Sequence, residues 1–436
     1  MADRDLAENP VRELVRRFFI TFLLGVVVYR LGVYIPIPGV NAKALGDLVK
    51  GAGGGDDPLG AILRYADMFN GGAIANSSIF GLGITPYISA SIIIQLLTFS
   101  IPTLKALQKE GESGRRKINQ YTRYATLVIC LVQSAIAAVA LSQYTSDAIV
   151  LVTMQPRWLF VVQSVLVITT GSMLTLWIAE QITKFGIGNG VSLIIMFGIL
   201  AYLPSAFTGF GSDLGKYLAV LLVALLIIAA IVVVVQAVRR INLEQQRRVQ
   251  GNKVYGGAQT TLPLKLNQAN VIPVIFASPI MVVLGIVAGK AGLDQIFAYG
   301  EPGHRYIFAA LIIAFTYFYI SITFDLNDLS NHFKQAGFFV RGIKPGKNTV
   351  DYLSRILVRI TFVGAIFLAL IAIMPELIGT SIGLSGHGAG VLLGGTGLLI
   401  VVGVTLDVMQ KVSAFFLANQ YQGLSAAGAK KSGKRF

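Results

Sequence analysis

Two glycine-rich stretches could bind phosphate groups, but neither occupies the structural context that this chemistry needs. Gly428–Lys434 (GAKKSGK) nearly matches a phosphate-binding loop, yet Arg435 stands where that loop needs Ser or Thr. Gly186, Gly188 and Gly190 have a spacing similar to a dinucleotide-binding fingerprint. They lie between two long apolar runs rather than in a βαβ unit, so we reject both nucleotide sites.

The residues that could ligate a metal or act as nucleophiles are few and scattered. The three histidines, His304, His332 and His387, lie in different predicted loops. The single cysteine, Cys130, lies in an apolar run and is expected to pack there as a small side chain. One cysteine excludes a disulfide framework and a Cys-based metal site. We therefore expect no metal and no cofactor, and we do not expect an enzyme.

The composition indicates a chain that meets lipid rather than water. Among 436 residues, 54% are apolar and only 13% are charged. Soluble domains usually carry about 25% charged residues, so a soluble surface could not be built from so few. The 47 glycines have no three-residue period, which excludes a collagen-like chain. The sequence predicts a helical protein that spans the membrane several times.

Apolar runs of about 20 residues, long enough to cross the hydrocarbon core as helices, predict ten spans. They are expected near 17–36, 76–101, 121–143, 157–183, 191–209, 215–238, 271–290, 306–324, 356–375 and 391–410. The second contains Pro86, and the seventh contains Pro273 and Pro279. Proline inside a membrane helix frees a carbonyl that neighbours must satisfy, so these two helices are predicted to face protein or water.

The loop charges predict the orientation of the chain. About 28 of the 36 Lys and Arg fall in the two terminal tails and in alternate loops. The positive-inside rule places these loops, and both termini, in the cytoplasm. Ten spans divide into two halves of five, and an odd number per half gives the second half an inverted topology.

Three basic loops, 103–120, 239–270 and 326–355, allow two interpretations. Their cations could act only as topology signals. Loop 239–270, however, carries six cations against the single acidic Glu244, and a projecting basic hairpin there could contact RNA phosphates or an acidic protein. The six cations are Arg239, Arg240, Arg247, Arg248, Lys253 and Lys265.

Ionisable residues avoid the centres of the predicted spans. Arg30, Glu180, Asp325 and Asp407 all fall at or near span ends. A buried intramembrane charge usually marks an ion or proton pathway, so this pattern disfavours a coupled transporter and fits a hydrophobic constriction. The short apolar segment Leu59–Gly72 is too short to cross the bilayer and predicts a re-entrant helix.

Seven motifs are distributed along nearly the whole chain: Tyr34–Val40 (YIPIPGV), Phe69–Gly72, Leu82–Leu97 (LGITPYISASIIIQLL), Lys109–Arg123 (KEGESGRRKINQYTR), Ala179–Ser192 (AEQITKFGIGNGVS), Val254–Ala277 and Gly394–Val402. Together they closely resemble the SecY family, the central subunits of bacterial protein-translocation channels. The resemblance implies an all-α polytopic clamshell with two pseudo-symmetric inverted halves, 1–205 and 206–436. It also implies a protein-conducting channel in the plasma membrane.

The resemblance further implies a waist of aliphatic side chains that closes around a moving polypeptide and blocks ions. The alternative is that these residues only pack or face lipid. Carried over by position, the pore ring is Ile84, Ile88, Val191, Ile195, Ile275 and Ile400.

Two moving parts are implied in the same way. A plug helix near 61–72 would seal the outer vestibule and would include Ile62, Leu63, Met68, Phe69, Gly71 and Gly72. A lateral gate would lie between spans two and three on one side and spans seven and eight on the other. It would open toward membrane lipid for signal sequences. Its residues would include Pro86, Gln95, Asn267 and Pro273.

The basic loops would dock the ribosome and the SecA ATPase through Arg239, Arg240, Arg247, Arg248, Lys253, Arg341 and Lys344. In Gly342–Gly346 (GIKPG), Lys344 stands where the family usually has Arg, and Lys lacks the planar fork. Other implied partners are SecE-like and SecG-like small membrane subunits and nascent polypeptides. A secondary transporter of small solutes is the alternative function, and a membrane enzyme or scaffold is a third.

Overall fold

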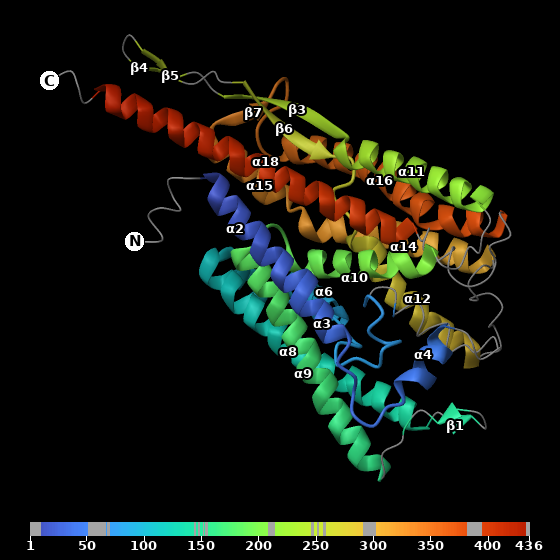
Figure 1. Cartoon of the computed structure of the whole chain (residues 1–436). Helices are drawn as coiled ribbons and strands as arrows, with labels where there is room; N and C mark the ends of the chain where they lie inside the picture. Colours follow the sequence, from blue (N-terminus) through green and yellow to red (C-terminus); the bar gives the residue numbers. More distant parts are fainter. Residues whose placement is uncertain are drawn as a thin grey trace. The chain divides into compact units, whose positions relative to one another are not determined.

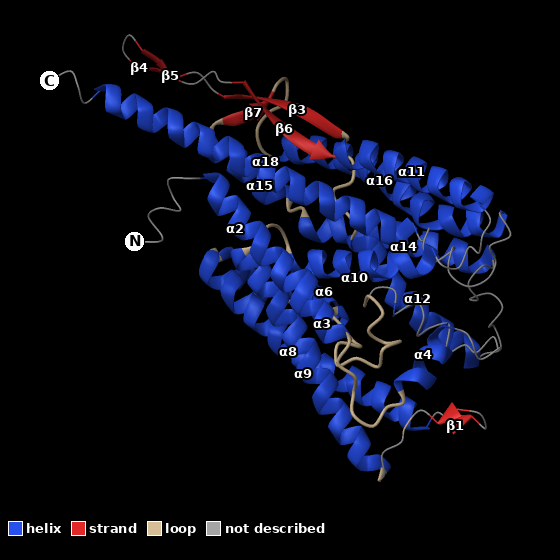
Figure 2. Cartoon of the chain, in the orientation of Figure 1, coloured by secondary structure: helices blue, strands red, loops and turns tan. Residues whose placement is uncertain are grey.

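A computed structural model describes residues 10–50, 67, 70–143, 145–146, 149–150, 152, 156–207, 214–245, 248–250, 253–255, 259–290, 302–381 and 395–432. Most of these residues are helical (Figures 1 and 2). The chain forms two compact units. The first comprises Met1–Gly209 and Val404–Phe436, and the second comprises Phe210–Gly403.

In the first unit, a continuous helical segment crosses the first predicted span as α2, the π-helical turn η1 and α3. Helix α8 packs against both α6 and α9, and α9 also contacts α2 and α10. The described helices are α2 (Pro10–Phe22), η1 (Leu23–Val28), α3 (Tyr29–Val33), α4 (Ala42–Lys50), α6 (Thr85–Ser100), α7 (Pro102–Lys109), α8 (Glu112–Gln143), α9 (Arg157–Phe185) and α10 (Gly190–Phe207).

Small side chains let α8 and α9 approach closely. The buried residues of α8 recur every four positions, which places them on one face of the helix: Thr122, Thr126, Cys130, Ser134 and Ala138. The hydroxyls of Ser134 and Thr169 lie 3.1 Å apart across the contact. This small-residue packing is the kind that membrane helices use in place of a hydrophobic driving force.

The second predicted span, 76–101, is wrong at its start. Helix α6 begins at Thr85, and residues 70–84 form a series of hydrogen-bonded turns. Positive φ angles interrupt any helix there, at Gly71 (65°), Gly72 (85°), Ser77 (51°) and Gly83 (53°). Pro86 then occupies the first turn of α6, where its missing N–H costs no hydrogen bond.

The second unit contains α11 (Leu214–Gln236), α12 (Ile272–Lys290), α14 (Pro302–Thr323), α15 (Leu326–Ala336), α16 (Lys347–Ser381) and the first turns of α18 (Gly395–Ser432). Helix α14 packs against α12 and α16. The unit also contains an antiparallel sheet in the order β6–β3–β7. Its strands are β3 (Val238–Gln245), β6 (Gln259–Lys265) and β7 (Phe338–Val340).

Two predicted loops are more ordered than expected. Loop 103–120 holds α7 and the start of α8, and loop 326–355 holds α15, β7 and the start of α16. These segments are polar, so a search for apolar runs does not detect them as helices. Within loop 239–270 the predicted hairpin is confirmed, because β3 pairs with β6 in antiparallel register.

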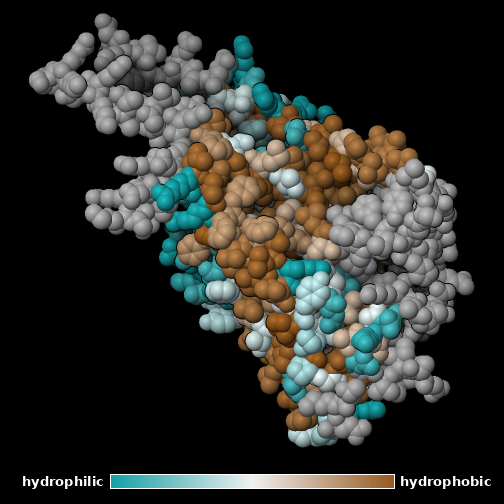
Figure 3. Space-filling model, viewed as in Figure 1, coloured by the Kyte–Doolittle hydropathy of each residue, from teal (hydrophilic) through white to brown (hydrophobic). Residues whose placement is uncertain are grey.

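The polytopic helical fold class is confirmed, and a helix overlaps each of the ten predicted ranges. Among the described residues, five helices are long and apolar enough to span a membrane, or six if the bent pair α6–α7 counts as one. Large apolar side chains dominate much of the described surface in Figure 3. On α11, for example, Leu222, Leu225 and Leu226 are all more than 60% exposed, as expected for a lipid-facing helix.

Candidate functional site

Four of the predicted ring residues lie in the first unit, in two pairs. Ile84 is the N-cap of α6, and the amide of Ile88 donates to its carbonyl at 3.2 Å. Val191 and Ile195 have the same four-residue spacing in the first turns of α10. Each pair therefore lies on one face of its helix, one turn apart.

The other two predicted ring residues lie in the second unit. The amide of Ile275, in the first turn of α12, donates to the carbonyl of Val271 at 3.2 Å. Ile400 is buried in α18, one turn before Gly403. A Cβ on Gly403 would lie only 3.0 Å from Val271 Cγ2, so α18 packs closely against the start of α12. Ile275 and Ile400 therefore each lie one helical turn from the contact between Val271 and Gly403.

All six side chains are aliphatic, which decides what the positions can do chemically. They cannot donate or accept a hydrogen bond, and they carry no charge that could bind an ion. If such side chains surround a narrow passage, a hydrated ion cannot enter because it would lose its water shell without compensation.

The predicted plug falls mostly outside the described residues. Ile62, Leu63, Met68 and Phe69 are in this group. Gly71 and Gly72 are described, and both lie in a turn with left-handed backbone rather than in a helix. A Cβ on Gly71 would lie 2.9 Å from the Cα of Gly198, so only glycine fits this close approach.

Polar groups that the sequence analysis did not assign hold this turn in place. Arg30 Nη1 donates to the carbonyl of Gly71 at 2.5 Å, and Tyr29 Oη donates to the carbonyl of Asn70 at 3.3 Å. Asp67 Oδ1 accepts from the amide of Ile74 at 2.7 Å. The only sign of these contacts in the sequence was Arg30, an arginine near the end of an apolar run.

The predicted gate residues differ in their surroundings. Pro86 and Pro273 are buried near the starts of α6 and α12, whereas Gln95 is exposed on α6. Asn267 is buried just before α12. Its Nδ2 donates to the carbonyl of Asn270 at 3.1 Å, and its Oδ1 has no hydrogen-bond partner among the described residues. A buried carbonyl oxygen left unpaired weakens the packing around it.

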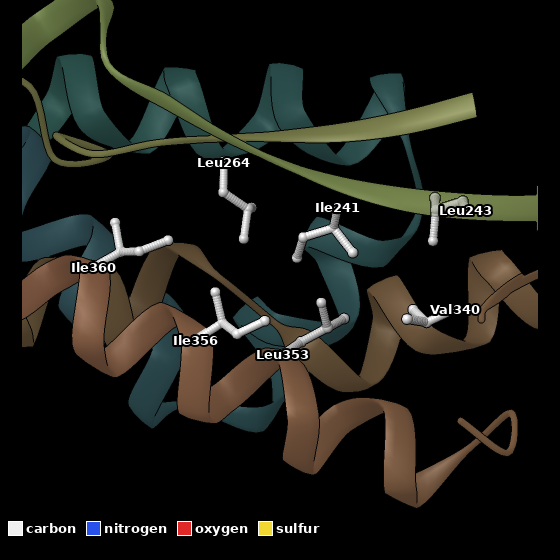
Figure 4. Packing of buried hydrophobic residues seen from close by; sticks show 7 residues of the cluster. All are labelled: Ile241, Leu243, Leu264, Val340, Leu353, Ile356 and Ile360. Carbon is white, nitrogen blue, oxygen red and sulfur yellow. The ribbon is translucent and has the colours of Figure 1, made fainter. Parts of the chain in front are cut away.

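The basic loop is built on an apolar base. Along β3, Ile241 and Leu243 are buried while Arg240 and Asn242 are exposed, the alternation of a half-buried strand. The buried side chains meet the first turns of α16, as Figure 4 shows. This cluster, here called the sheet core, comprises Ile241, Leu243, Leu264, Val340, Leu353, Ile356 and Ile360.

The sheet core presents the predicted docking cations to solvent. Arg239, Arg240 and Lys344 are exposed, and Arg341 is 82% exposed with Nε 3.7 Å from Glu244 Oε1. The single acidic residue of the 239–270 loop is therefore engaged with Arg341, the cation that follows β7. Arg247 lies outside the described residues. Arg248 and Lys253 belong to the strand pair β4 (Arg248–Gln250) and β5 (Lys253–Tyr255).

The two glycine-rich stretches are not nucleotide sites. Gly186–Gly190 forms the short connection between α9 and α10, and the segment from Gly428 to Ser432 is the end of helix α18. Within the described part of the chain, no group of three His, Cys, Asp or Glu could hold a metal ion.

Comparison with known proteins agrees with this architecture. A family model described as SecY matches residues 78–409. The chain is 40% identical over 452 residues to the protein translocase subunit SecY of Escherichia coli K12, covering 99% of this chain and 98% of that protein.

Two solved structures share the fold, each over 93% of both chains. One is a SecY channel whose plug domain stabilises the closed state, with a TM-score of 0.61 and 16% identity. The other is Sec61 in a canine ribosome-channel complex, with a TM-score of 0.56 and 15% identity. The family match and the full-length bacterial relative together show that this chain belongs to the SecY family.

Proposed function

We propose that this protein is the channel subunit of a bacterial protein translocase. It passes unfolded secretory polypeptides across the plasma membrane and releases membrane-protein segments sideways into lipid. The observation that carries this function is the full-length relationship to protein translocase subunits, combined with a membrane core whose expected pore positions are all aliphatic.

The proposed constriction is the ring of Ile84, Ile88, Val191, Ile195, Ile275 and Ile400. Aliphatic side chains can close around a moving chain without holding it by hydrogen bonds, and they exclude hydrated ions when the passage is narrow. The resting seal would be completed by a plug attached at Gly71 and Gly72. A secondary transporter is not favoured, because none of these positions could bind a coupling ion.

The lateral opening is proposed to lie beside Pro86 and Gln95 on one side and Asn267 and Pro273 on the other. The two halves that move are 1–205 and 206–436, carrying spans one to five and six to ten. Among the described residues the buried Oδ1 of Asn267 has no hydrogen-bond partner, which supports this role because a buried polar atom without a partner costs free energy in the closed packing.

The energy source is proposed to be external, supplied by the ribosome or by the SecA ATPase docked on the basic sheet. The similar canine Sec61 is part of a ribosome-channel complex, which supports a ribosome as partner. SecE-like and SecG-like subunits would complete the channel. Both termini and the basic loops would be cytoplasmic, as the loop charges predict.

Site-specific cross-linking of a stalled secretory chain tests this function. Photoreactive residues at positions 88, 195, 275 and 400 should cross-link to the substrate, whereas one at Ile93, exposed on α6, should not. Depletion of the protein should also stall export of secretory precursors. Export at the normal rate after depletion, or a substrate that contacts none of the four positions, would contradict the proposal.

A further inference from the structure

We infer that Thr21 and Thr183 are positioning residues that hold the α9–α10 connection and thereby fix Val191 and Ile195 in the constriction. The inference rests on the proposed function of the ring. It concerns two hydroxyls on different helices, α2 and α9, that each bond to a backbone amide of residues 186–190.

Thr183 bonds to the first residue of α10. Its Oγ1 donates to the carbonyl of Ala179 at 2.9 Å and accepts from the amide of Gly190 at 2.8 Å. The first amides of a helix have no partner inside that helix. The Thr183 hydroxyl supplies one from the preceding helix, so the start of α10 is tied to the end of α9.

Thr21 repeats this arrangement from another helix. Its Oγ1 donates to the carbonyl of Arg17 at 2.9 Å and accepts from the amide of Ile187 at 3.0 Å. Thr21 is 8% exposed and Ile187 is 7% exposed, so water cannot readily replace this bond. In both cases the hydroxyl proton is used within its own helix, which leaves a lone pair for the loop amide.

Two glycines show how closely the connection is held. A Cβ on Gly190 would lie 1.9 Å from the carbonyl oxygen of Ala179, and a Cβ on Gly186 would lie 2.4 Å from Thr21 Oγ1. Any side chain at either position would push the connection away from its threonine. Close packing against α2 and α9 therefore explains two of the three glycines that mimic a dinucleotide fingerprint, and the third, Gly188, has a φ of 91° that favours glycine.

The position of Val191 follows from this attachment. It is the second residue of α10, and its amide donates to Asn189 Oδ1 at 3.1 Å, inside the same connection. The first N–H groups of a helix have no partner inside it, so the groups that precede α10 supply the bonds that hold these amides. Ile195 lies one turn later on the same face and moves with Val191.

The test uses the channel purified with its partner subunits and compares Thr183→Val, Thr183→Ser and Thr170→Val. Thr170 is a matched control on α9, because it is exposed like Thr183 and, within the described part of the chain, its hydroxyl bonds only to the carbonyl of Leu166. Hydrogen exchange of the peptide 186–193 reports the attachment, and resting ion conductance in planar bilayers reports the constriction. Thr21→Ala removes the second hydroxyl without adding volume beside Gly186.

We expect Thr21→Ala to speed exchange in peptide 186–193 by about tenfold, the effect of losing one buried hydrogen bond, and Thr183→Val to speed it by less, because Thr183 is exposed and its bond to Gly190 is only partly buried. Both should raise resting conductance, Thr183→Ser should restore both readouts, and Thr170→Val should change neither. Unchanged exchange in both variants would overturn the attachment.

An Ile195→Gly variant separates the inference from the function on which it rests. If Ile195→Gly leaks but the threonine variants exchange faster without leaking, the positioning role is overturned and the ring stands. If Ile195→Gly does not leak either, the ring is misassigned and the inference fails with it.

Discussion

Arg123 and Glu180 form a two-pronged ion pair between α8 and α9: Nε donates to Oε1 at 2.6 Å and Nη2 donates to Oε2 at 2.8 Å. The side chains are 52% and 33% exposed. Arg123 directly follows Thr122, the first residue of the stripe of small side chains on α8, so the pair lies beside that stripe. The two parallel hydrogen bonds restrain how α8 and α9 are aligned along each other, although an exposed ion pair contributes little free energy.

A double-mutant cycle with Arg123→Lys and Glu180→Gln should give a coupling free energy of about 0.5 kcal/mol, reduced by added salt. Lysine cannot make both parallel bonds, so Arg123→Lys should lose most of this coupling. Thermal unfolding in detergent measures it. The i,i+4 pair of Arg116 and Glu112, 76% and 82% exposed, is the control and should give a value near zero. Equal coupling for both pairs would contradict a special role for the fork.

Gly71→Ala should destabilise the protein more than Gly111→Ala. Both glycines have positive φ angles, 65° and 80°, so alanine costs about 1 kcal/mol at each for backbone strain. At Gly111 no atom of the described residues lies within 4 Å of an added Cβ, whereas at Gly71 the Cβ would lie 2.9 Å from the Cα of Gly198. The difference between the melting-temperature shifts of the two variants measures the cost of the contact between the added Cβ and Gly198. Equal shifts would show that the turn relaxes away from Gly198.

Leu353→Ala should loosen the basic sheet. Leu353 is 1% exposed in the sheet core, and removing such a side chain costs about 2–4 kcal/mol. Protease cleavage within strands β3 and β6 should become faster, and ribosome binding should weaken. Val358→Ala, 51% exposed on the same helix, is the control and should leave cleavage unchanged. If Leu353→Ala and Val358→Ala are cleaved equally slowly, the sheet core does not stabilise strands β3 and β6.

Arg240→Glu should weaken ribosome binding, and the effect should shrink as salt rises. Each phosphate contact removed lowers the slope of log affinity against log salt by about one. Lys43→Glu carries the same charge change on α4, which the charge rule places on the opposite side of the membrane, and should bind normally. Co-sedimentation at several salt concentrations measures both. Identical slopes for the two variants would refute docking through this strand.

Hydropathy predicted the helices because a membrane span needs a long apolar run, and that requirement leaves a direct mark on the sequence. The start of α6 was predicted too early because residues 76–84 are as apolar as a helix but contain Ser77 and Gly83 in left-handed conformations. The backbone, rather than the hydrophobicity, decides the boundary there. The polar helices α7 and α15 were missed for the opposite reason, since they lie in predicted loops.

Contacts between distant residues left no mark that a single sequence could show. Thr21 and Ile187 are 166 positions apart, and β7 joins β3 through only three residue pairs, Leu243 with Val340 among them. Serine and threonine are common in membrane helices, so their types alone do not indicate partners. The ring, plug and gate residues come from the family resemblance and stay predictions.

The π-helical turn Leu23–Val28 sets the rotation of the residues that follow it. It accommodates one more residue than an α-helical turn would, and Tyr29 and Arg30 then reach Asn70 and Gly71. A chain lacking one residue in this turn could still form an unbroken α-helix. Because the wider turn absorbs the extra residue, the two side chains would keep nearly their present direction, so a single-residue deletion within Leu23–Val28 should be less harmful than one in α2, which would rotate everything after it by about 100°.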